Sequence, residues 1–146
     1  MNTVFWDPHN ASNRISVKLV CLAKNQVLLI RKIGETNFNL IWGGVDYWES
    51  LEATIQREFV EETGIILEKE NCPKLLNVEL KHFPPGGQFD WVLNIFYLLE
   101  FDHQFTLQLE EGIYEEYKRC SREELKNLPV TEHTNKDIVF SAYNEE

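Results

Sequence analysis

The feature that most constrains the fold of this chain is a helix with recognisable signals at both of its ends. Ser50 is of the residue type that caps the N-terminus of helices, and Gly64 is of the type preferred just beyond their C-terminus. Between them, Leu51, Ile55 and Phe59 recur every four residues and form one apolar face. The sequence therefore predicts an amphipathic helix over roughly residues 50–63 that packs on a hydrophobic core.

Alternating or continuous apolar runs on both sides of this helix predict short strands. Polar residues 23–26 separate the first two strands, and the turn sequence Pro-Pro-Gly-Gly at 84–87 separates the next two, so two hairpins are expected. Residues 33–42 are expected to form a loop that leads into the tight backbone of Gly43 and Gly44. By residue number, the predicted strands are 15–22, 27–30, 75–83, 89–101 and 114–120.

Two further helices are expected near the C-terminal end. Ser121 and Glu124 have the spacing of a capping box and open a brief helix before Pro129, and a final helix is expected after Thr134. This order of elements predicts a mixed β-sheet covered by helices on its faces, an α/β or α+β sandwich. A length of 146 residues fits a single domain over residues 1–146.

Composition and charge exclude several classes of function. A net charge of −10, from 24 acidic and 14 basic residues, disfavours a long nucleic acid as partner, whereas a small phosphorylated ligand stays compatible because a bound divalent cation can invert the local field. The sequence shows neither a secretory leader nor an apolar run of membrane-spanning length, so a cytoplasmic protein without a membrane partner is expected. The cysteines Cys21, Cys72 and Cys120 are widely separated and indicate neither a disulfide framework nor a zinc site.

Three carboxylates share one side of the predicted helix. Glu58, Glu61 and Glu62 are spaced i, i+3 and i+4, and a like-charge pair at i, i+4 destabilises a helix by roughly 0.2–0.5 kcal/mol. Such a cluster on its own is more often a solvated helix face. A hard divalent cation that prefers oxygen ligands would remove the repulsion, and Mg²⁺ is the natural candidate, with Mn²⁺ as a substitute.

The residues around the cluster complete a longer pattern: Gly, five residues, Glu, seven residues, Arg-Glu, an apolar residue, any residue, Glu-Glu, any residue, Gly and an apolar residue. In this chain the identities occur at Gly43, Glu49, Arg57, Glu58, Glu61, Glu62 and Gly64. The segment 43–65 resembles the signature of the Nudix hydrolase family at every fixed position. Ile41 and Trp48 stand where relatives commonly have proline and glycine, but neither falls on a defining position.

This resemblance implies an α/β/α sandwich with a loop–helix–loop metal site. It assigns Glu58, Glu61 and Glu62 to the metal shell, with the carbonyl of Gly43 as a further oxygen ligand. Glu49 and Arg57 are implied to tie the loop to the helix.

The identity of the catalytic base stays open, because members of the family take it either from a glutamate of the box, such as Glu61 or Glu58, or from a later loop. The candidates for the later position are Glu110, Glu111, Glu115 and Glu116.

Three residues are candidates for substrate binding. Arg31 follows the strand 27–30, where relatives often place a basic residue near the phosphates, although a solvated strand end explains it equally well. Gly44 lacks a side chain and so allows phosphate and metal to approach closely. Trp48 either stacks on a base or caps the core. The other aromatic residues considered for stacking, with core packing as the default, are Phe38, Trp42, Tyr47 and Trp91.

Together these observations predict a Mg²⁺-dependent pyrophosphatase that cleaves a phosphoanhydride bond in a nucleoside diphosphate linked to another moiety. The small size favours a nucleoside triphosphate or a nucleotide sugar, while the box itself does not identify the substrate. The alternatives are a non-catalytic nucleotide-sensing module, which usually has eroded glutamates, and an isomerase of isoprenoid diphosphates. The oligomeric state stays open between a monomer and a homodimer, since some relatives pair through their sheets.

Overall fold

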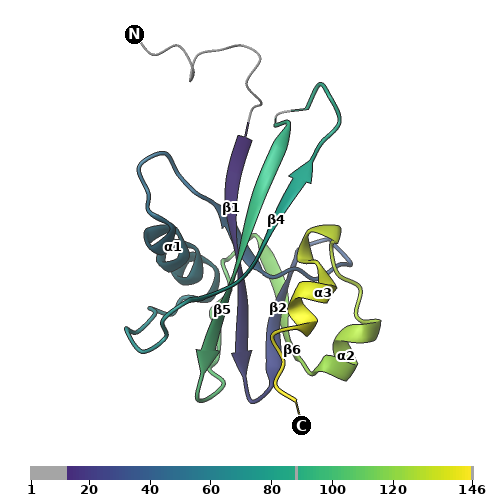
Figure 1. Ribbon diagram of the computed structural model, residues 1–146. Coiled ribbons are helices and arrows are strands. Elements are labelled where there is room, and N and C mark those ends of the chain that lie inside the picture. Colours follow the sequence, from purple (N-terminus) through teal and green to yellow (C-terminus); the bar gives the residue numbers. More distant parts are fainter. Residues whose placement is uncertain (1–12, 88, 146) are drawn as a thin grey trace.

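The computed structural model describes residues 13–87 and 89–145 and forms a six-stranded mixed sheet with helices on both faces (Figure 1). The strands are β1 (Asn13–Ala23), β2 (Gln26–Lys32), β3 (Ile41–Gly44), β4 (Lys74–His82), β5 (Trp91–Phe101) and β6 (Tyr114–Cys120). The helices are α1 (Leu51–Thr63), α2 (Arg122–Asn127) and α3 (Lys136–Phe140), with a 3₁₀ turn η2 at Glu132–Thr134. The expected mixed sheet covered by helices is thus confirmed.

The sheet has the strand order β4-β5-β1-β2-β6, with β3 paired to β1. β1 runs parallel to β5 over their whole length, and every other pairing is antiparallel. β2 pairs with β1 only beside their shared turn, and β3 pairs with the stretch of β1 from Ser16 to Leu19. β1 is therefore the central strand, and it brings β3 and β5 together.

Both predicted hairpins are confirmed. Lys24 and Asn25 form the turn between β1 and β2 with φ angles of 53° and 55°, as expected for a tight hairpin turn. β4 and β5 are antiparallel neighbours around the turn at 84–87, which is closed by a hydrogen bond from the Phe83 N–H to the Asp90 carbonyl.

One prediction for this region was wrong. Residues 33–42 were expected to be a loop, but Ile41 and Trp42 belong with Gly43 and Gly44 to the strand β3. Four residues containing two glycines have little strand propensity of their own, so the pairing with β1 determines their conformation.

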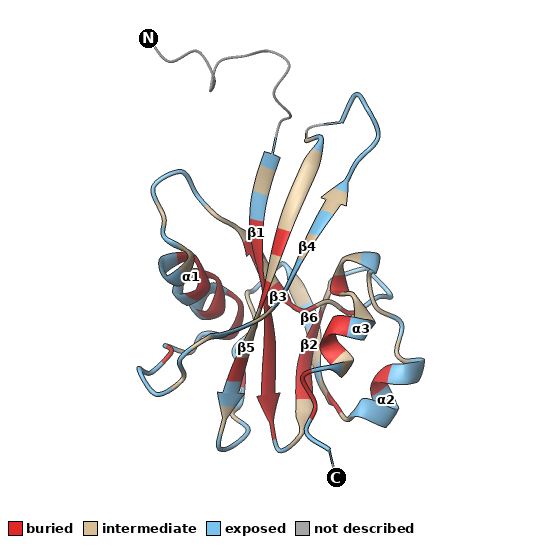
Figure 2. Cartoon of the chain, viewed as in Figure 1, coloured by how far each residue is buried: buried red, intermediate tan, exposed pale blue. Residues whose placement is uncertain are grey.

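α1 begins and ends where its caps predict. The Ser50 side chain accepts a hydrogen bond from the Ala53 N–H, and Gly64 is left-handed with a φ of 76°. Ile55 and Phe59 are buried beneath the helix in a cluster with Val17 of β1. This apolar face fixes α1 on one face of the sheet (Figure 2).

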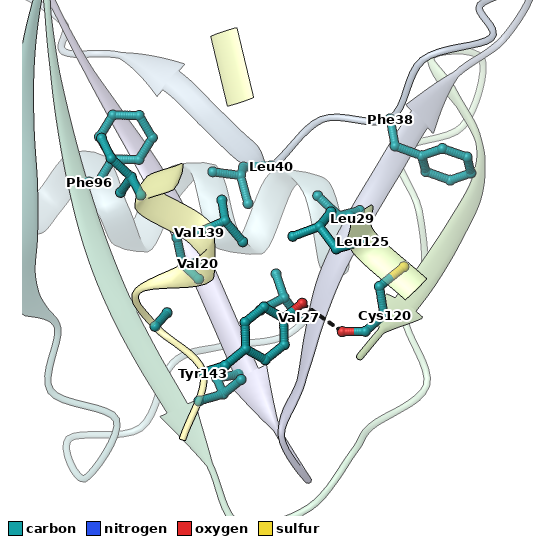
Figure 3. Close-up of a cluster of buried hydrophobic side chains, with 13 residues drawn as sticks. Val20, Val27, Leu29, Phe38, Leu40, Phe96, Cys120, Leu125, Val139 and Tyr143 are labelled. Carbon is teal, nitrogen blue, oxygen red and sulfur yellow. Dashed lines mark hydrogen bonds between the residues drawn. The ribbon is translucent and has the colours of Figure 1, made fainter. Parts of the chain in front are cut away.

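A second cluster fills the opposite face of the sheet, beneath α2 and α3 (Figure 3). Val20 and Leu29 contribute from the strands, and Leu125 and Val139 from the two helices. The Tyr143 hydroxyl donates to the Cys120 carbonyl at 2.8 Å and ties the C-terminal segment to β6. Across residues 13–87 and 89–145, no helix is long and apolar enough to cross a membrane.

Candidate active site

The two glycines of β3 face opposite sides of the sheet, because successive residues of a strand alternate between its faces. A Cβ on Gly43 would lie 2.0 Å from the carboxyl carbon of Glu58 on the α1 side. A Cβ on Gly44 would lie 1.9 Å from Nη2 of Arg14 on the other side. Neither glycine has a positive φ, so what both positions require is space. β3 is thus closely approached by a carboxylate on one face and a guanidinium on the other.

Arg57 connects the loop after β3 to α1. Its Nε and Nη2 donate to the two carboxylate oxygens of Glu49 at 2.6 and 2.7 Å, and Nη2 also donates to the Gly44 carbonyl at 3.1 Å. Nη1 donates to Glu58 Oε1 at 2.6 Å. These bonds from Arg57 hold the pKa of Glu49 down at about 2. The expected contact between Glu49 and Arg57 is therefore present, and the same guanidinium also orients Glu58.

Glu58 and Glu62 lie on the inner side of α1 with exposed fractions of 8% and 5%. Burial raises the pKa of both carboxyls, that of Glu62 to about 8. The Tyr114 hydroxyl donates to Glu62 Oε1 at 2.8 Å, whereas Glu62 Oε2 is buried without a hydrogen-bond partner. A buried oxygen left unpaired is unfavourable, and the charges of Glu58 and Glu110 add to the raised pKa of this carboxyl.

The third carboxylate of the box, that of Glu61, is more exposed than those of Glu58 and Glu62 but shares Arg57 with Glu58. The Glu61 side chain is about half exposed, and its Oε2 lies 3.5 Å from Nη1 of Arg57. In the part of the chain that the structure describes, no group of three or more His, Cys, Asp or Glu side chains is already arranged to hold a metal ion. The available donors nevertheless fit a hard divalent cation, because they are carboxylate and carbonyl oxygens and one of them, Glu62 Oε2, is buried without a partner.

The four candidates for a later catalytic base have different surroundings. Glu115 and Glu116 accept from Arg31 at 3.2 and 2.8 Å. The charge of Glu110 instead contributes to the raised pKa values of Glu62 and Tyr114, so Glu110 is electrostatically linked to the site. The exposed Glu111 has no such influence among the causes of the shift at Glu62.

Arg31 also donates to the Glu35 carbonyl at 2.8 Å, so its guanidinium is engaged by three acceptors. Its expected contact with substrate phosphates stays a prediction.

A pocket of about 550 Å³ opens on the face of the sheet opposite α1, next to β3. We call it the Lys18 pocket. Its walls are largely apolar and come from Trp42, Phe83, Phe89 and Val92. Its polar lining consists of Arg14, Ser16, Lys18, Gly44, Asn94 and His133. This volume lies within the range of small-ligand pockets, roughly 300–1,000 Å³. Since Trp42 and Gly44 belong to β3, the pocket adjoins the strand that carries Gly43.

The aromatic candidates have distinct positions. Trp48 is 89% exposed, which excludes core capping, and it forms an edge contact with the exposed Tyr47 at 4.3 Å between centroids. Phe38 is buried in the core, and Trp91 contacts His82. Of the aromatic candidates named from the sequence, Trp42 lines the Lys18 pocket. Stacking by Trp48 on a base stays a prediction.

Sequence reasoning missed Arg14, Lys18, Asn94 and Tyr114. The first three occupy polar positions in alternating strands, which indicate a solvated face unless the other strands and helices of the fold are known. Tyr114 reaches Glu62 from a strand 52 residues further along the chain. The local sign of a site was Lys18, which is the one charged residue in the run 15–22.

The fold and the loop–helix segment define the class of this protein, which is that of the NUDIX domains. The model of the NUDIX domain family matches residues 12–142, and the chain belongs to this family.

Solved structures share the fold. A MutT NUDIX hydrolase from Burkholderia pseudomallei has a TM-score of 0.72 at 23% identity, covering 90% of this chain and 98% of that chain. The NUDIX domain of Shewanella oneidensis NrtR, complexed with ADP ribose, has a TM-score of 0.72 at 17% identity and covers 97% of each chain. The dihydroneopterin triphosphate pyrophosphohydrolase of E. coli has a TM-score of 0.71 at 16% identity, with coverage of 87% and 92%.

Proposed function

We propose that this protein is a Mg²⁺-dependent pyrophosphohydrolase that cleaves a phosphoanhydride bond in a nucleoside triphosphate or another nucleoside diphosphate derivative. The observation that carries the proposal is Glu62 Oε2, a carboxylate oxygen buried without a partner beside Glu58. In a protein that needed these glutamates only for stability, an apolar or paired side chain would serve better at this position.

Glu58, Glu61, Glu62 and the carbonyl of Gly43 are the groups that would hold the cation. When bound, Mg²⁺ neutralises charge on the diphosphate and polarises its phosphorus–oxygen bonds. Arg57 orients Glu58 and ties Glu49 to the helix, so the carboxylates stay in place when the substrate arrives. Arg14 crosses Gly44 on the opposite face and supplies a guanidinium for the phosphates.

In the reaction, a water oxygen attacks one phosphorus atom while the bond from that phosphorus to the bridging oxygen breaks. The proton of the water passes to a carboxylate, for which the candidates are Glu61 and Glu110. Glu61 is exposed enough to exchange protons with solvent, and Glu110 is the later glutamate whose charge reaches Glu62. Glu110→Gln separates them, because Glu61 would also hold the cation: a lower kcat with unchanged KM in Glu110→Gln would assign the base to Glu110, and an unchanged kcat would assign it to Glu61.

The test is an assay of released phosphate or pyrophosphate with nucleoside triphosphates, nucleotide sugars, ADP-ribose, dinucleoside polyphosphates and coenzyme A, with Mg²⁺ and with EDTA. Glu61→Gln and Glu62→Gln should abolish turnover of the best substrate while circular dichroism shows an unchanged fold. Glu123→Gln is the matched control, because Glu123 is an exposed helical glutamate paired with Lys126.

Full activity in both box variants, or full activity in EDTA, would contradict the proposal. If several of these compounds bind but none is cleaved, the protein is the non-catalytic nucleotide-sensing module instead.

A further inference from the structure

The Lys18 pocket contains a buried lysine that forms no ion pair with any residue that the structure describes. Lys18 is only 2% exposed, yet in the described part of the chain its ammonium takes part in neither an ion pair nor a side-chain hydrogen bond. Within the described residues, the ammonium lies over the ring of Trp42, whose centroid is 4.8 Å from Nζ. A buried charge is ordinarily paired, because removal from water is strongly unfavourable. An ammonium in this state, on the wall of a pocket, is suited to a ligand that supplies the missing acceptor.

The charge of Glu79 acts on Lys18, but the hydrogen bonds of this carboxylate are formed with side-chain amides and not with the ammonium. Glu79 accepts from the side-chain amides of Asn94 at 3.3 Å and Asn135 at 2.6 Å. The Asn94 oxygen in turn accepts from the Ser16 hydroxyl at 2.9 Å. This network holds the Asn94 amide in one orientation, with its NH₂ group as donor. Lys18 therefore provides donors to a ligand, and none of the described residues that line the pocket is a carboxylate.

The walls indicate what kind of ligand brings the acceptor. Trp42, Phe83 and Phe89 are aromatic and come from β3 and from both sides of the β4–β5 turn. Aromatic walls favour a flat ring system, because stacking on a base contributes roughly 1–3 kcal/mol whereas a phosphate keeps its hydration. The position next to Gly44 suits the phosphates better, since the guanidinium of Arg14 lies there.

We propose that the Lys18 pocket binds the base of the substrate and selects bases with an oxo group, such as hypoxanthine, guanine or uracil, over bases with an amino group at the same position. The ammonium of Lys18 has three donors and no acceptor, so it binds an oxo oxygen and opposes an amino group. This inference rests on the proposed function, because it takes the ligand to be a nucleoside diphosphate or its derivative.

The experiment is isothermal titration calorimetry of the full chain in EDTA, where no turnover occurs. Inosine and adenosine 5′-diphosphates differ at the 6-position in an oxo or an amino group, and uridine and cytidine 5′-diphosphates differ likewise at the 4-position. We expect the oxo member of at least one pair to bind roughly tenfold more tightly, as a hydrogen bond from a charged donor allows. The pair that shows the difference identifies a purine or a pyrimidine pocket.

Lys18→Met removes the charge at similar volume, so it should abolish the oxo preference and also raise the melting temperature of the ligand-free protein. Lys18→Gln retains N–H donors and should keep part of the preference. Lys126→Met, which replaces an exposed lysine paired with Glu123, is the matched control and should change neither property. A lysine with a purely structural role would alter the melting temperature and leave the oxo preference intact.

Equal affinities within both pairs, no binding of any of the four nucleotides, or an oxo preference that survives in Lys18→Met would overturn the inference. So would a tenfold loss of inorganic pyrophosphate binding in Lys18→Met, because the lysine would then hold a phosphate. Because binding is measured in EDTA, an oxo preference without turnover would contradict the proposed function but not the inference about the Lys18 pocket. Turnover without an oxo preference would contradict only the inference about the Lys18 pocket.

Discussion

The two glycines of β3 allow a paired test of the site, because a methyl group added to each meets a different neighbour. In Gly43→Ala the new Cβ would lie 2.0 Å from the carboxyl carbon of Glu58, whereas non-bonded carbons prefer about 3.5–4.0 Å. The Glu58 carboxyl must therefore move by about 1.5 Å, and it is buried and held by Arg57. A misplacement of 1 Å can lower a rate by about 100-fold, and overpacking typically destabilises by about 1–3 kcal/mol.

We therefore expect Gly43→Ala to lower kcat/KM by at least about 100-fold, measured as phosphate release from the best substrate of the panel. Urea unfolding should show that the variant stays folded under the assay conditions. Gly44→Ala is the control, because its Cβ meets the end of the Arg14 side chain, which is free of ion pairs within residues 13–87 and 89–145 and can rotate away. Its main effect should be a higher KM. A Gly43→Ala variant with wild-type kcat/KM would refute the inference that catalysis requires the Glu58 carboxyl in its present position next to Gly43.

Three further predictions concern charges at the site. Burial raises the pKa of Glu62 from 4.5 to about 8, so the metal-free folded protein holds a proton that the unfolded chain releases. Its free energy of unfolding in EDTA should fall by at most about 5 kcal/mol between pH 4.5 and pH 8, and Glu62→Gln should flatten this slope in urea titrations; an unchanged slope would contradict the assignment. Tyr114→Phe removes the donor to Glu62 Oε1 and should destabilise the metal-free protein by about 1–3 kcal/mol, which thermal unfolding in EDTA measures against Tyr47→Phe, a change at an exposed ring. Arg14→Met should raise KM more than Arg31→Met does, because Glu115 and Glu116 already engage Arg31; the opposite order in steady-state kinetics would return the phosphate contact to Arg31.

Sequence alone predicts the parts of this fold whose causes are local. Ser50 and Gly64 bracket α1 because each acts on backbone groups within one turn of itself. The capping box of Ser121 and Glu124 is present at the start of α2 for the same reason. The strand β6 has the predicted bounds, since its apolar and polar residues and the adjacent cap are all contiguous.

The elements that sequence reasoning missed depend on distant partners. β3 is a strand because Ser16 to Leu19 of β1 pair with it, and nothing within residues 33–44 reveals that pairing. The parallel pairing of β1 with β5 joins Ser16 to Asn94, 78 residues apart. The Lys18 pocket depends on both pairings, so its residues could not be recognised from their local pattern. The carboxylates of α1, in contrast, could be recognised from the sequence, because their helical spacing lies within a few consecutive residues.

A buried ionisable group without a full set of partners lies on each face of β3. On the α1 face of β3, burial raises the pKa of Glu62, and one of its oxygens has no partner. On the opposite face, burial lowers the pKa of Lys18 to about 8, and its ammonium forms no ion pair with a described residue. The charges of Glu79 and Glu62 partly offset this shift at Lys18, and that of Glu62 acts from across the sheet. One ligand would stabilise both groups. The cation bound to its diphosphate would pair with Glu62, and an acceptor on its base would pair with Lys18. Replacing Lys18 by methionine should therefore raise the stability of the ligand-free protein and lower its affinity for such a ligand.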